Sequence, residues 1–340
     1  MEAKSGGTVH LIATGGTIAS VPSAHGLVPG FGGAEILRYC QSALLHYDIE
    51  IEDLLNLDSS NIQPEEWQIM ARAVARALTS PRPPVGIVIT HGTDTMAYTA
   101  AALSYMLVNL PLPVVLTGSQ LPITDPLSDA TANLAAALAM ATSGVPGVFL
   151  AFDRQILLGT RAVKVRTTGF AAFESINHPI VGHIGGDGLV LDHSCLPPPV
   201  NGPFRLEDAV DASVMVLKLS PGFDPGLLEA LPARGCRALV LEAFGIGGVH
   251  ELRRNLLTAL ESLIAAGLVV VVGSQCLYER SDFRRYAVGR SVLERGAVPA
   301  FDMTTESCVA KLITLLGRYR DPAEVARRFR EPVCGDIQSA

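Results

Sequence analysis

Four segments of the sequence place glycines, hydroxyl residues and carboxylates directly after short apolar runs. They read ATGGT (residues 13–17), LDSSN (57–61), ITHGTDT (89–95) and LTGSQ (116–120). Ligands bind beyond the carboxyl ends of the strands in an open α/β sheet, so side chains that follow parallel strands converge on one edge. Hydroxyls grouped with a base are suited to covalent catalysis, in which an activated hydroxyl attacks a carbonyl carbon.

Each segment also has a simpler interpretation as a turn. The Gly-Gly-Thr stretch can be a tight turn before a helix, and its glycine spacing matches neither a phosphate-binding loop nor a dinucleotide fingerprint. In HGTDT, Asp94 or Thr95 can cap a helix by accepting backbone N–H groups. DSSN reads as a capping turn before Pro64, and Lys164 is by default a solvated cation. No single segment therefore establishes catalysis.

The elements that must position these segments are apolar runs that alternate with longer helical stretches. The runs are apolar on both faces, as parallel strands covered by helices on both sides should be. Pro64 stands where the first turn of a helix tolerates proline, followed by two glutamates at the positive end of the helix dipole. This alternation predicts an α/β fold. The expected strands are 8–14, 85–90, 113–118, 147–152, 213–220, 237–244 and 267–275, and the expected helices include 64–80, 129–143 and 251–267.

The chain is long enough for two domains of medium size. It has 340 residues, of which 49% are hydrophobic and 17% charged, so the composition allows a large core. Residues 185–209 are rich in glycine and proline, and the strand–helix rhythm restarts at Val214. We predict an N-terminal catalytic α/β domain over residues 1–190, a linker over 191–212 and a smaller C-terminal α/β domain over 213–340.

Composition excludes several classes of protein. The formal net charge of −7 argues against non-specific nucleic-acid binding, which needs a basic surface. The six cysteines form no C-x-x-C pair, which is typical of a reducing compartment. No apolar run reaches the roughly 18 residues that cross a bilayer, the first residues do not resemble a signal peptide, and the histidines show no metal-ligand spacing. We expect a cytoplasmic protein that binds neither nucleic acid nor membranes.

Taken together, ATGGTIAS (13–20) and ITHGTDTMAYTAAALSYML (89–107) resemble the two signature segments of the bacterial-type L-asparaginases. These enzymes are amidohydrolases with two catalytic threonines. The similarity continues through LDSSNIQPEEW, VVLTGSQLPI, LLGTRAVKVRTT and AFESIN, and in the second half through EAFGIGG, VVVVGSQC and FDMTTESCVAKL. The later motifs are more similar to the cytoplasmic branch of the family than to the secreted branch.

The resemblance implies hydrolysis of the side-chain amide of L-asparagine to L-aspartate and ammonia through a threonine acyl-enzyme. It implies a two-domain asparaginase-like fold, with a larger N-terminal sheet flanked by helices. It also implies a homo-oligomer, a dimer or a tetramer, in which each site lies near the C-terminal domain of a neighbouring subunit. Neither a metal nor an organic cofactor is expected.

Site residues follow from the resemblance position by position. The catalytic residues that it implies are a threonine nucleophile and a cluster that handles the proton: Thr17, Thr93, Asp94 and Lys164. For substrate binding it implies Asp58, Ser59, Ser60, Thr93, Asp94 and Ser119. Lys164 accepts a proton only when it is neutral, whereas Asp94 stabilises its ammonium form. The sequence therefore leaves open which member of the cluster takes the proton.

Three positions depart from the family pattern. Leu27 aligns with a tyrosine that helps to activate the nucleophile, Asn61 stands where relatives often have aspartate, and Gly248 stands where they commonly have asparagine. Each lost hydrogen bond to a charged ammonium costs about 1.5–3 kcal/mol. These changes therefore affect recognition of the substrate more than cleavage of its amide bond.

Alternative functions consequently remain open. One is a glutaminase-asparaginase or a hydrolase of another small amide, and a second is a tRNA-dependent amidotransferase subunit, which the acidic composition suits poorly. A third is an amino-acid-binding homologue without turnover.

Overall fold

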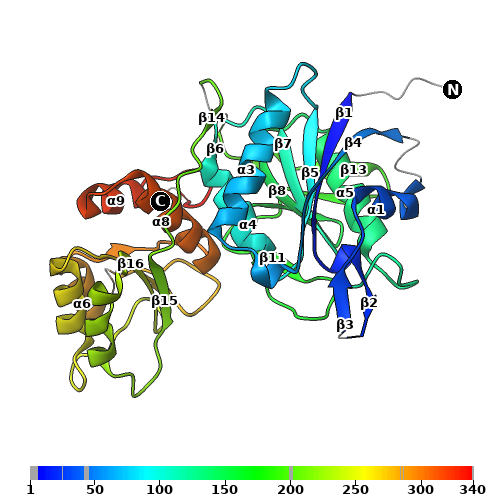
Figure 1. Cartoon of the computed structure of the whole chain (residues 1–340). Helices are drawn as coiled ribbons and strands as arrows, with labels where there is room; N and C mark the ends of the chain where they lie inside the picture. Colours follow the sequence, from blue (N-terminus) through cyan, green and yellow to red (C-terminus); the bar gives the residue numbers. More distant parts are fainter. Residues whose placement is uncertain are drawn as a thin grey trace. The chain divides into compact units, whose positions relative to one another are not determined.

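The computed structural model describes residues 7–24, 26–41, 46–198, 202–283, 285 and 287–338. The chain divides into two compact units, Met1–Asp208 and Ala209–Ala340, and the colours of Figure 1 follow them from blue to green and from green to red. All the candidate site residues fall in the first unit. The assignment of residues 191–212 to a linker stays a prediction.

The first unit is built on an eight-stranded mixed sheet. Its strand order is β13-β12-β9-β8-β7-β5-β1-β4, in which β4, β1, β5, β7 and β8 pair in parallel and β9, β12 and β13 each pair antiparallel with their neighbours. The strands are β1 (Thr8–Gly15), β4 (Asp48–Leu57), β5 (Gly86–Thr90), β7 (Pro113–Thr117), β8 (Gly147–Phe152), β9 (Gln155–Leu158), β12 (Gly182–Gly185) and β13 (Gly188–Leu191). The expected strands of this half are confirmed.

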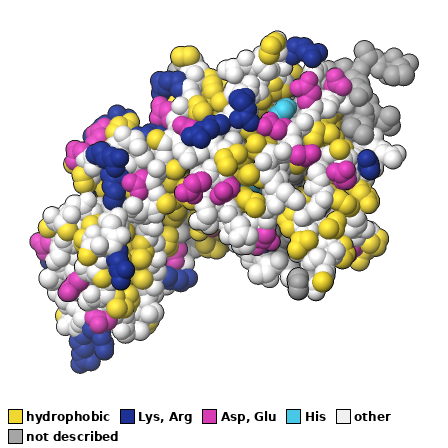
Figure 2. Space-filling model, viewed as in Figure 1, with side chains coloured by type: hydrophobic (Ala, Val, Ile, Leu, Met, Phe, Trp, Pro, Cys, Tyr) yellow, Lys and Arg dark blue, Asp and Glu magenta, His cyan; other side chains and the backbone are white. Residues whose placement is uncertain are grey.

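Smaller elements complete the first unit. The strands β2 (Ser20–Ser23) and β3 (Gly26–Pro29) pair as a hairpin, over which Figure 2 shows hydrophobic side chains gathered at the surface. The other short pairs are β10 (Ala162–Lys164) with β11 (Phe173–Ser175), and β6 (Leu107–Val108) with β14 (Arg205–Leu206). The helices are α1 (Gly33–Tyr39), α3 (Pro64–Leu78), α4 (Met96–Met106) and α5 (Ala130–Ala141), with short 3-10 turns η1 (Thr17–Ala19), η2 (Ser59–Asn61) and η3 (His193–Cys195).

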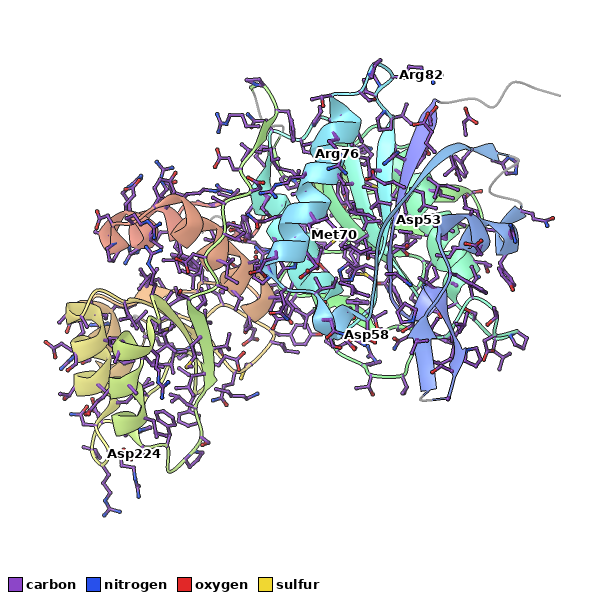
Figure 3. The ribbon with its side chains drawn as sticks, viewed as in Figure 1. Asp53, Asp58, Met70, Arg76, Arg82 and Asp224 are labelled. Carbon is purple, nitrogen blue, oxygen red and sulfur yellow. The ribbon has the colours of Figure 1, made fainter. Side chains whose placement is uncertain are left out.

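Helix α3 begins where its sequence predicts. Pro64 lies in the first turn, and the Glu66 carboxylate accepts the Gln63 N–H at 2.8 Å, which satisfies a donor that the helix cannot. Met70 on its buried face packs inward, whereas Arg76 on the outer face pairs with Glu52 of β4 at 2.7 Å. Figure 3 marks Met70 and Arg76 on this helix.

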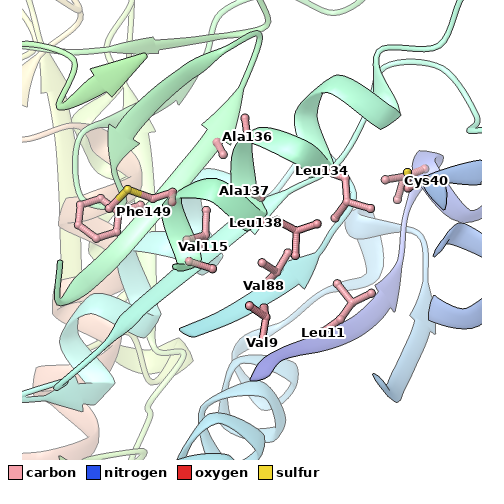
Figure 4. Packing of buried hydrophobic residues seen from close by; sticks show 14 of the residues in the cluster. Val9, Leu11, Cys40, Val88, Val115, Leu134, Ala136, Ala137, Leu138 and Phe149 are labelled. Carbon is pink, nitrogen blue, oxygen red and sulfur yellow. The ribbon is translucent and has the colours of Figure 1, made fainter. Parts of the chain in front are cut away.

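Helices cover both faces of the sheet. On one face, Leu11, Val88 and Val115 of the central strands share a hydrophobic cluster with Leu134 and Leu138 of α5, as Figure 4 shows. Helix α5 is rich in alanine, and its small side chains let the helix lie close to the strands. Helices α3 and α4 contact each other and cover the opposite face (Figure 1).

The second unit contains a four-stranded parallel sheet with a core on each face. Its strands lie in the order β15-β16-β17-β18, with α6 on one side and α8 and α9 on the other. The bounds are β15 (Val214–Lys218), β16 (Ala238–Ala243), β17 (Val269–Ser274), β18 (Val298–Pro299), α6 (Leu256–Ala265), α7 (Ala287–Glu294), α8 (Thr305–Arg318) and α9 (Pro322–Phe329), with 3-10 turns η4 (Pro225–Ala230) and η5 (Pro232–Arg234). Helix α6 begins later than the expected residue 251, because the Asn255 side chain accepts the Thr258 N–H and caps the helix there.

The described residues contain neither a membrane-spanning helix nor a metal-binding cluster. None of their helices is both long and apolar enough to span a membrane. Among the same residues, no group of three or more His, Cys, Asp or Glu side chains is arranged to hold a metal ion.

The second unit contains a buried ion pair near the end of the chain. The ammonium of Lys311 on α8 lies 2.7 Å from Asp336 Oδ2, and the two side chains are only 3% and 0% exposed. Lys311 Nζ also donates to the Glu331 carbonyl at 2.6 Å and lies 5.3 Å from the centre of the Phe329 ring. Removal of one partner would leave the other as a buried, unpaired charge.

We expect Asp336→Ala to lower the free energy of unfolding by about 3–5 kcal/mol, because it leaves the buried Lys311 ammonium without its carboxylate. Urea denaturation measures this loss. The control is Glu261→Ala in the same unit, which breaks a pair with Arg295 whose side chains are 63% and 33% exposed, and it should cost less than about 1 kcal/mol. Equal losses in the two variants would contradict this account of the pair.

Candidate active site

The carboxyl ends of three parallel strands meet in backbone contact. A Cβ on Gly16 would lie 2.3 Å from the Gly92 nitrogen, and a Cβ on Gly92 would lie 2.6 Å from Ser59 Oγ. Gly16 also has a φ of +79°, which glycine adopts far more readily than other residues. Glycine is therefore required at both positions, so that the segments after β1, β5 and β4 can touch.

Hydrogen bonds hold these strand ends in register. The Gly16 N–H donates to the Leu57 carbonyl at 2.9 Å, joining β1 to β4. Thr14 Oγ1 donates to the Thr90 carbonyl at 2.7 Å, joining β1 to β5. The His91 N–H donates to the Thr117 carbonyl at 2.8 Å, joining β5 to β7. The sequence prediction that the polar segments converge on one sheet edge is confirmed.

Thr17 and Thr93 flank the glycine contact. Thr17 is the first residue of η1 and is partly exposed, and among the described residues its hydroxyl has no hydrogen-bond partner. Thr93 follows Gly92 in the same way that Thr17 follows Gly16, and it is 5% exposed. The contact between Gly16 and Gly92 therefore brings the two threonine-bearing segments side by side.

A lysine binds the segment HGTDT (residues 91–95), which carries Thr93. Lys164 ends β10, and its Nζ donates to Thr93 Oγ1 at 2.8 Å and to Asp94 Oδ1 at 2.6 Å. The lysine side chain is 17% exposed and the aspartate side chain 62% exposed. The structure thus brings together three of the predicted residues in one hydrogen-bonded cluster that can carry a proton.

The loop after β4 supplies a carboxylate. Asp58 is exposed and marked at the end of β4 in Figure 3. Its Oδ1 accepts the Ser60 N–H at 2.9 Å and the Ser60 hydroxyl at 2.6 Å, and these bonds lower the pKa of Asp58. Ser59 is buried and its Oγ accepts the Asp94 N–H at 3.2 Å. The loop therefore presents an ionised carboxylate and is tied to the lysine cluster.

The capping interpretation of HGTDT does not hold. Thr95 stands at the N-cap of α4, but no side chain caps that helix end, and Thr95 Oγ1 donates instead to the Ser59 carbonyl at 2.7 Å. Asp94 is paired with Lys164 rather than with backbone N–H groups. Both side chains connect the strand ends to one another.

Sequence reasoning missed Gln120. Its Oε1 accepts from Thr93 Oγ1 at 3.3 Å, and its Nε2 donates to the carbonyls of Thr167 at 3.2 Å and Gly169 at 3.0 Å. Ser119, the neighbour predicted from sequence, is buried and its hydroxyl donates to the Leu121 carbonyl at 2.5 Å. The position of Gln120 directly after a strand exit was the only signal available.

A buried chain of hydrogen bonds supports the segment HGTDT through His91. The Trp67 indole N–H donates to Thr99 Oγ1 at 3.1 Å, Thr99 Oγ1 lies 3.0 Å from His91 Nε2, and His91 Nδ1 lies 2.7 Å from the Gly92 carbonyl. Because the Gly92 carbonyl only accepts, the His91 proton sits on Nδ1, and Nε2 of the neutral ring accepts the Thr99 proton. Complete burial lowers the pKa of His91 to about 4, so the ring is neutral.

Several backbone N–H groups at the site already donate hydrogen bonds within the protein. Those of Gly16, His91 and Asp94 donate to other strand ends or to Ser59. Within the described part of the chain, the N–H groups of Gly92 and Thr93 have no acceptor. Neither of these two N–H groups is therefore already used in a hydrogen bond with another described residue.

Comparisons with known proteins place both halves of the chain in the same family. Residues 8–195 match the family model described as "Asparaginase, N-terminal", and residues 213–329 match "Glutaminase/Asparaginase C-terminal domain". An L-asparaginase of Thermococcus kodakarensis is 43% identical over 330 residues, which cover 96% of this chain and 98% of that protein. The solved structure of the thermostable L-asparaginase from Thermococcus kodakarensis matches with a TM-score of 0.92 and 42% identity, covering 98% of this chain and 100% of that one.

A second kind of relative is longer than this chain. A glutamyl-tRNA(Gln) amidotransferase component of Thermococcus kodakarensis is 35% identical over 340 residues. The match covers 97% of this chain and 76% of that protein.

The glycine contact predicts a large loss of stability on substitution. We expect Gly16→Ala and Gly92→Ala each to lower the free energy of unfolding by at least about 2 kcal/mol, since each new methyl group overlaps the neighbouring strand end. Urea denaturation measures the loss. Gly186→Ala is the control, because a Cβ there meets nothing within 4 Å, and its change should stay within about 0.5 kcal/mol. Losses of the control's size at Gly16 and Gly92 would refute the contact.

Burial of neutral His91 predicts a pH dependence of stability. The unfolded chain binds a proton at His91 below about pH 6.5, whereas the folded protein binds it only below about pH 4. Stability therefore falls as the pH falls between these values, by about 3 kcal/mol at pH 4. His91→Gln should remove this part of the slope in urea denaturation from pH 7 to 4.

The exposed His183 provides the matched control. His183→Gln should keep the slope of the unchanged protein. An identical slope in His91→Gln would contradict the neutral assignment.

Proposed function

The chain belongs to the asparaginase family, and on that premise we propose that it hydrolyses the side-chain amide of L-asparagine to L-aspartate and ammonia. The observation that carries this proposal is the cluster of Thr93, Lys164 and Asp94, with Nζ 2.8 Å from the threonine hydroxyl and 2.6 Å from the carboxylate. It lies on the segment that touches Gly16, the residue before Thr17. A nucleophilic hydroxyl and a proton-handling group are thereby placed on neighbouring strand ends.

The reaction divides into two steps. Thr17 Oγ1 attacks the side-chain carbonyl carbon, and its proton passes to the cluster of Thr93, Lys164 and Asp94. The C–N bond then breaks, the nitrogen takes up a proton and ammonia leaves an aspartyl ester on Thr17. A water molecule attacks that ester, one of its protons returns to Thr17, and aspartate is released.

The negative charge on the reacting oxygen needs hydrogen-bond donors. The N–H groups of Gly92 and Thr93 suit this role, because within the described part of the chain they have no acceptor. They are also held in place by the chain that ends on the Gly92 carbonyl. One well-placed donor of this kind contributes about 3 kcal/mol to the stability of the transition state.

The head group of the substrate matches the loop after β4. Asp58, whose pKa is lowered by the Ser60 bonds, offers a negative charge to the α-ammonium group. Hydroxyls and N–H groups of the same loop and of the segment HGTDT are suited to donate hydrogen bonds to the α-carboxylate. We assign substrate binding to Asp58, Ser59, Ser60, Thr93, Asp94 and Ser119.

A broader amide specificity is the second candidate function. Leu27 lies on β3 with 55% of its surface exposed, and its side chain carries no hydroxyl that would help to activate Thr17. At Gly248, a Cβ would lie 3.4 Å from the Phe244 carbonyl, an ordinary contact, so the backbone there does not require glycine. The lack of a polar side chain at both positions favours glutamine or another small amide as an additional substrate.

We further propose a homo-oligomer, a dimer or a tetramer, in which the C-terminal domain of one subunit contributes to the site of another. A reducing compartment such as the cytoplasm suits the six cysteines, all of which lie in the described part of the chain and form no disulfide there. The net charge of −7 does not suit nucleic acid as a partner. We also propose an N-terminal catalytic domain over residues 1–190, a linker over 191–212 and a C-terminal domain over 213–340.

Ammonia release from L-asparagine tests the proposal. We expect Thr17→Ala, Thr93→Ala and Lys164→Met each to lower kcat by about 10³-fold or more, because each removes a group that acts on the reacting atoms. Thr79→Ala, at the exposed end of α3, is the matched control and should keep full activity. Mass spectrometry after rapid acid quenching should find the aspartyl ester on the peptide that contains Thr17.

A panel of amides decides between the two candidate functions. kcat/KM for L-asparagine, L-glutamine and other small amides shows which is preferred. No release from any of them by the unchanged protein, or full activity in both threonine variants, would refute the proposed hydrolysis.

A further inference from the structure

We propose that Gln120 is a positioning residue that fixes the direction of the Thr93 hydroxyl proton. The proposal rests on the proposed function, in which Thr93 belongs to the proton-handling cluster. Gln120 acts through Thr93 and through the turn that follows Lys164. Four hydrogen bonds and the number of protons on each group lead to this inference.

The first step is the count of protons at Thr93. The pair with Asp94 at 2.6 Å favours the ammonium form of Lys164, and in that form Nζ only donates, so at 2.8 Å it uses one lone pair of Thr93 Oγ1. The hydroxyl has a single proton, and the neighbouring acceptor is Gln120 Oε1 at 3.3 Å. The proton of Thr93 therefore points to Gln120.

The second step is the orientation of the Gln120 amide. Its Nε2 donates to the carbonyls of Thr167 at 3.2 Å and Gly169 at 3.0 Å. Carbonyl oxygens only accept, so a flipped amide would set three oxygens against one another. Oε1 is thereby forced to face Thr93, where it can only accept.

The third step is what holds Gln120 itself. Its backbone N–H donates to both carboxylate oxygens of Asp129 at 3.0 and 3.1 Å, and Asn133 Nδ2 donates to the same carboxylate at 2.9 Å. The residues whose carbonyls it binds lie in the turn between β10 and β11, just after Lys164. Gln120 is fixed at both ends, and it links Thr93 to the turn that follows the lysine.

The consequence is a defined polarity for Thr93. Thr93 Oγ1 donates its proton to Gln120 and uses one lone pair to accept from Lys164, so it has one lone pair left. Before the reaction begins, it can therefore accept a hydrogen bond from the substrate amide or from the attacking water, and its own proton is not directed at either. Without Gln120, the proton can turn into the site and oppose those donors.

Gln120→Met tests the proposal first. It keeps the length of the side chain and removes both the acceptor and the donors. We expect kcat for L-asparagine to fall by about 10- to 100-fold, as for a misplaced catalytic group, while KM changes by less than about threefold. Gln68→Met is the matched control, because Gln68 Nε2 also donates to a backbone carbonyl, that of Asp208 at 2.7 Å, outside the site. The control should keep kcat.

Gln120→Glu gives a readout that a merely structural role would not move. The protonated carboxyl can accept from Thr93 and donate to one turn carbonyl, whereas the ionised carboxylate cannot donate. The ratio of its kcat to that of the unchanged protein should therefore rise as the pH falls, and should be at least tenfold higher at pH 5 than at pH 8. The charged groups that face this position are Lys164 and Asp94 beyond Thr93, Asp129 at the backbone and Arg166 on the turn. They are present in both proteins, so the ratio isolates the introduced carboxyl.

The outcomes separate the two proposals. No amide hydrolysis by the unchanged protein overturns the proposed function. An active unchanged protein whose kcat survives Gln120→Met, or whose ratio with Gln120→Glu is flat with pH, overturns the role of Gln120 alone. Loss of kcat in Gln120→Met together with the falling ratio supports it, and thermal denaturation of each variant confirms that the protein is folded.

Discussion

The candidate site depends on a steric constraint, the absence of side chains where three strand ends touch. Parallel pairing brings β4 and β5 alongside β1, but a Cβ at either Gly16 or Gly92 would overlap the neighbouring segment. The N–H of Gly16 is used to bind Leu57, so the contact is also fixed in register. Every group assigned to chemistry stands one or two residues beyond this contact or is hydrogen-bonded to a residue that does.

Two chains of hydrogen bonds then set where the protons lie. One runs from Lys164 through Thr93 and Gln120 to turn carbonyls, and the other from Trp67 through Thr99 and His91 to the Gly92 carbonyl. Each chain begins on a group that only donates and ends on one that only accepts. While Lys164 is an ammonium neither chain can reverse, so the polarity of the site is set before a substrate arrives.

The sequence was sufficient for features that depend on strand order and strand ends. Apolar runs predicted the parallel strands, and their carboxyl ends had to meet at one edge. It was insufficient for helix α4, whose residues are apolar all round and show no periodicity, and for β9, β12 and β13, which are short and pair antiparallel. The role of Gln120 depends on how the turn after β10 folds back, and no local pattern encodes that.

The positions that depart from the family pattern lie outside the glycine contact. Leu27 and Asn61 are exposed, and Gly248 has room for a side chain, so a change at any of them leaves the strand ends undisturbed. The Gly16–Gly92 contact and the Lys164 cluster, by contrast, involve buried backbone and directed hydrogen bonds that tolerate little change. Recognition of the amide can therefore vary in this fold while the groups that we propose to cleave it stay in place.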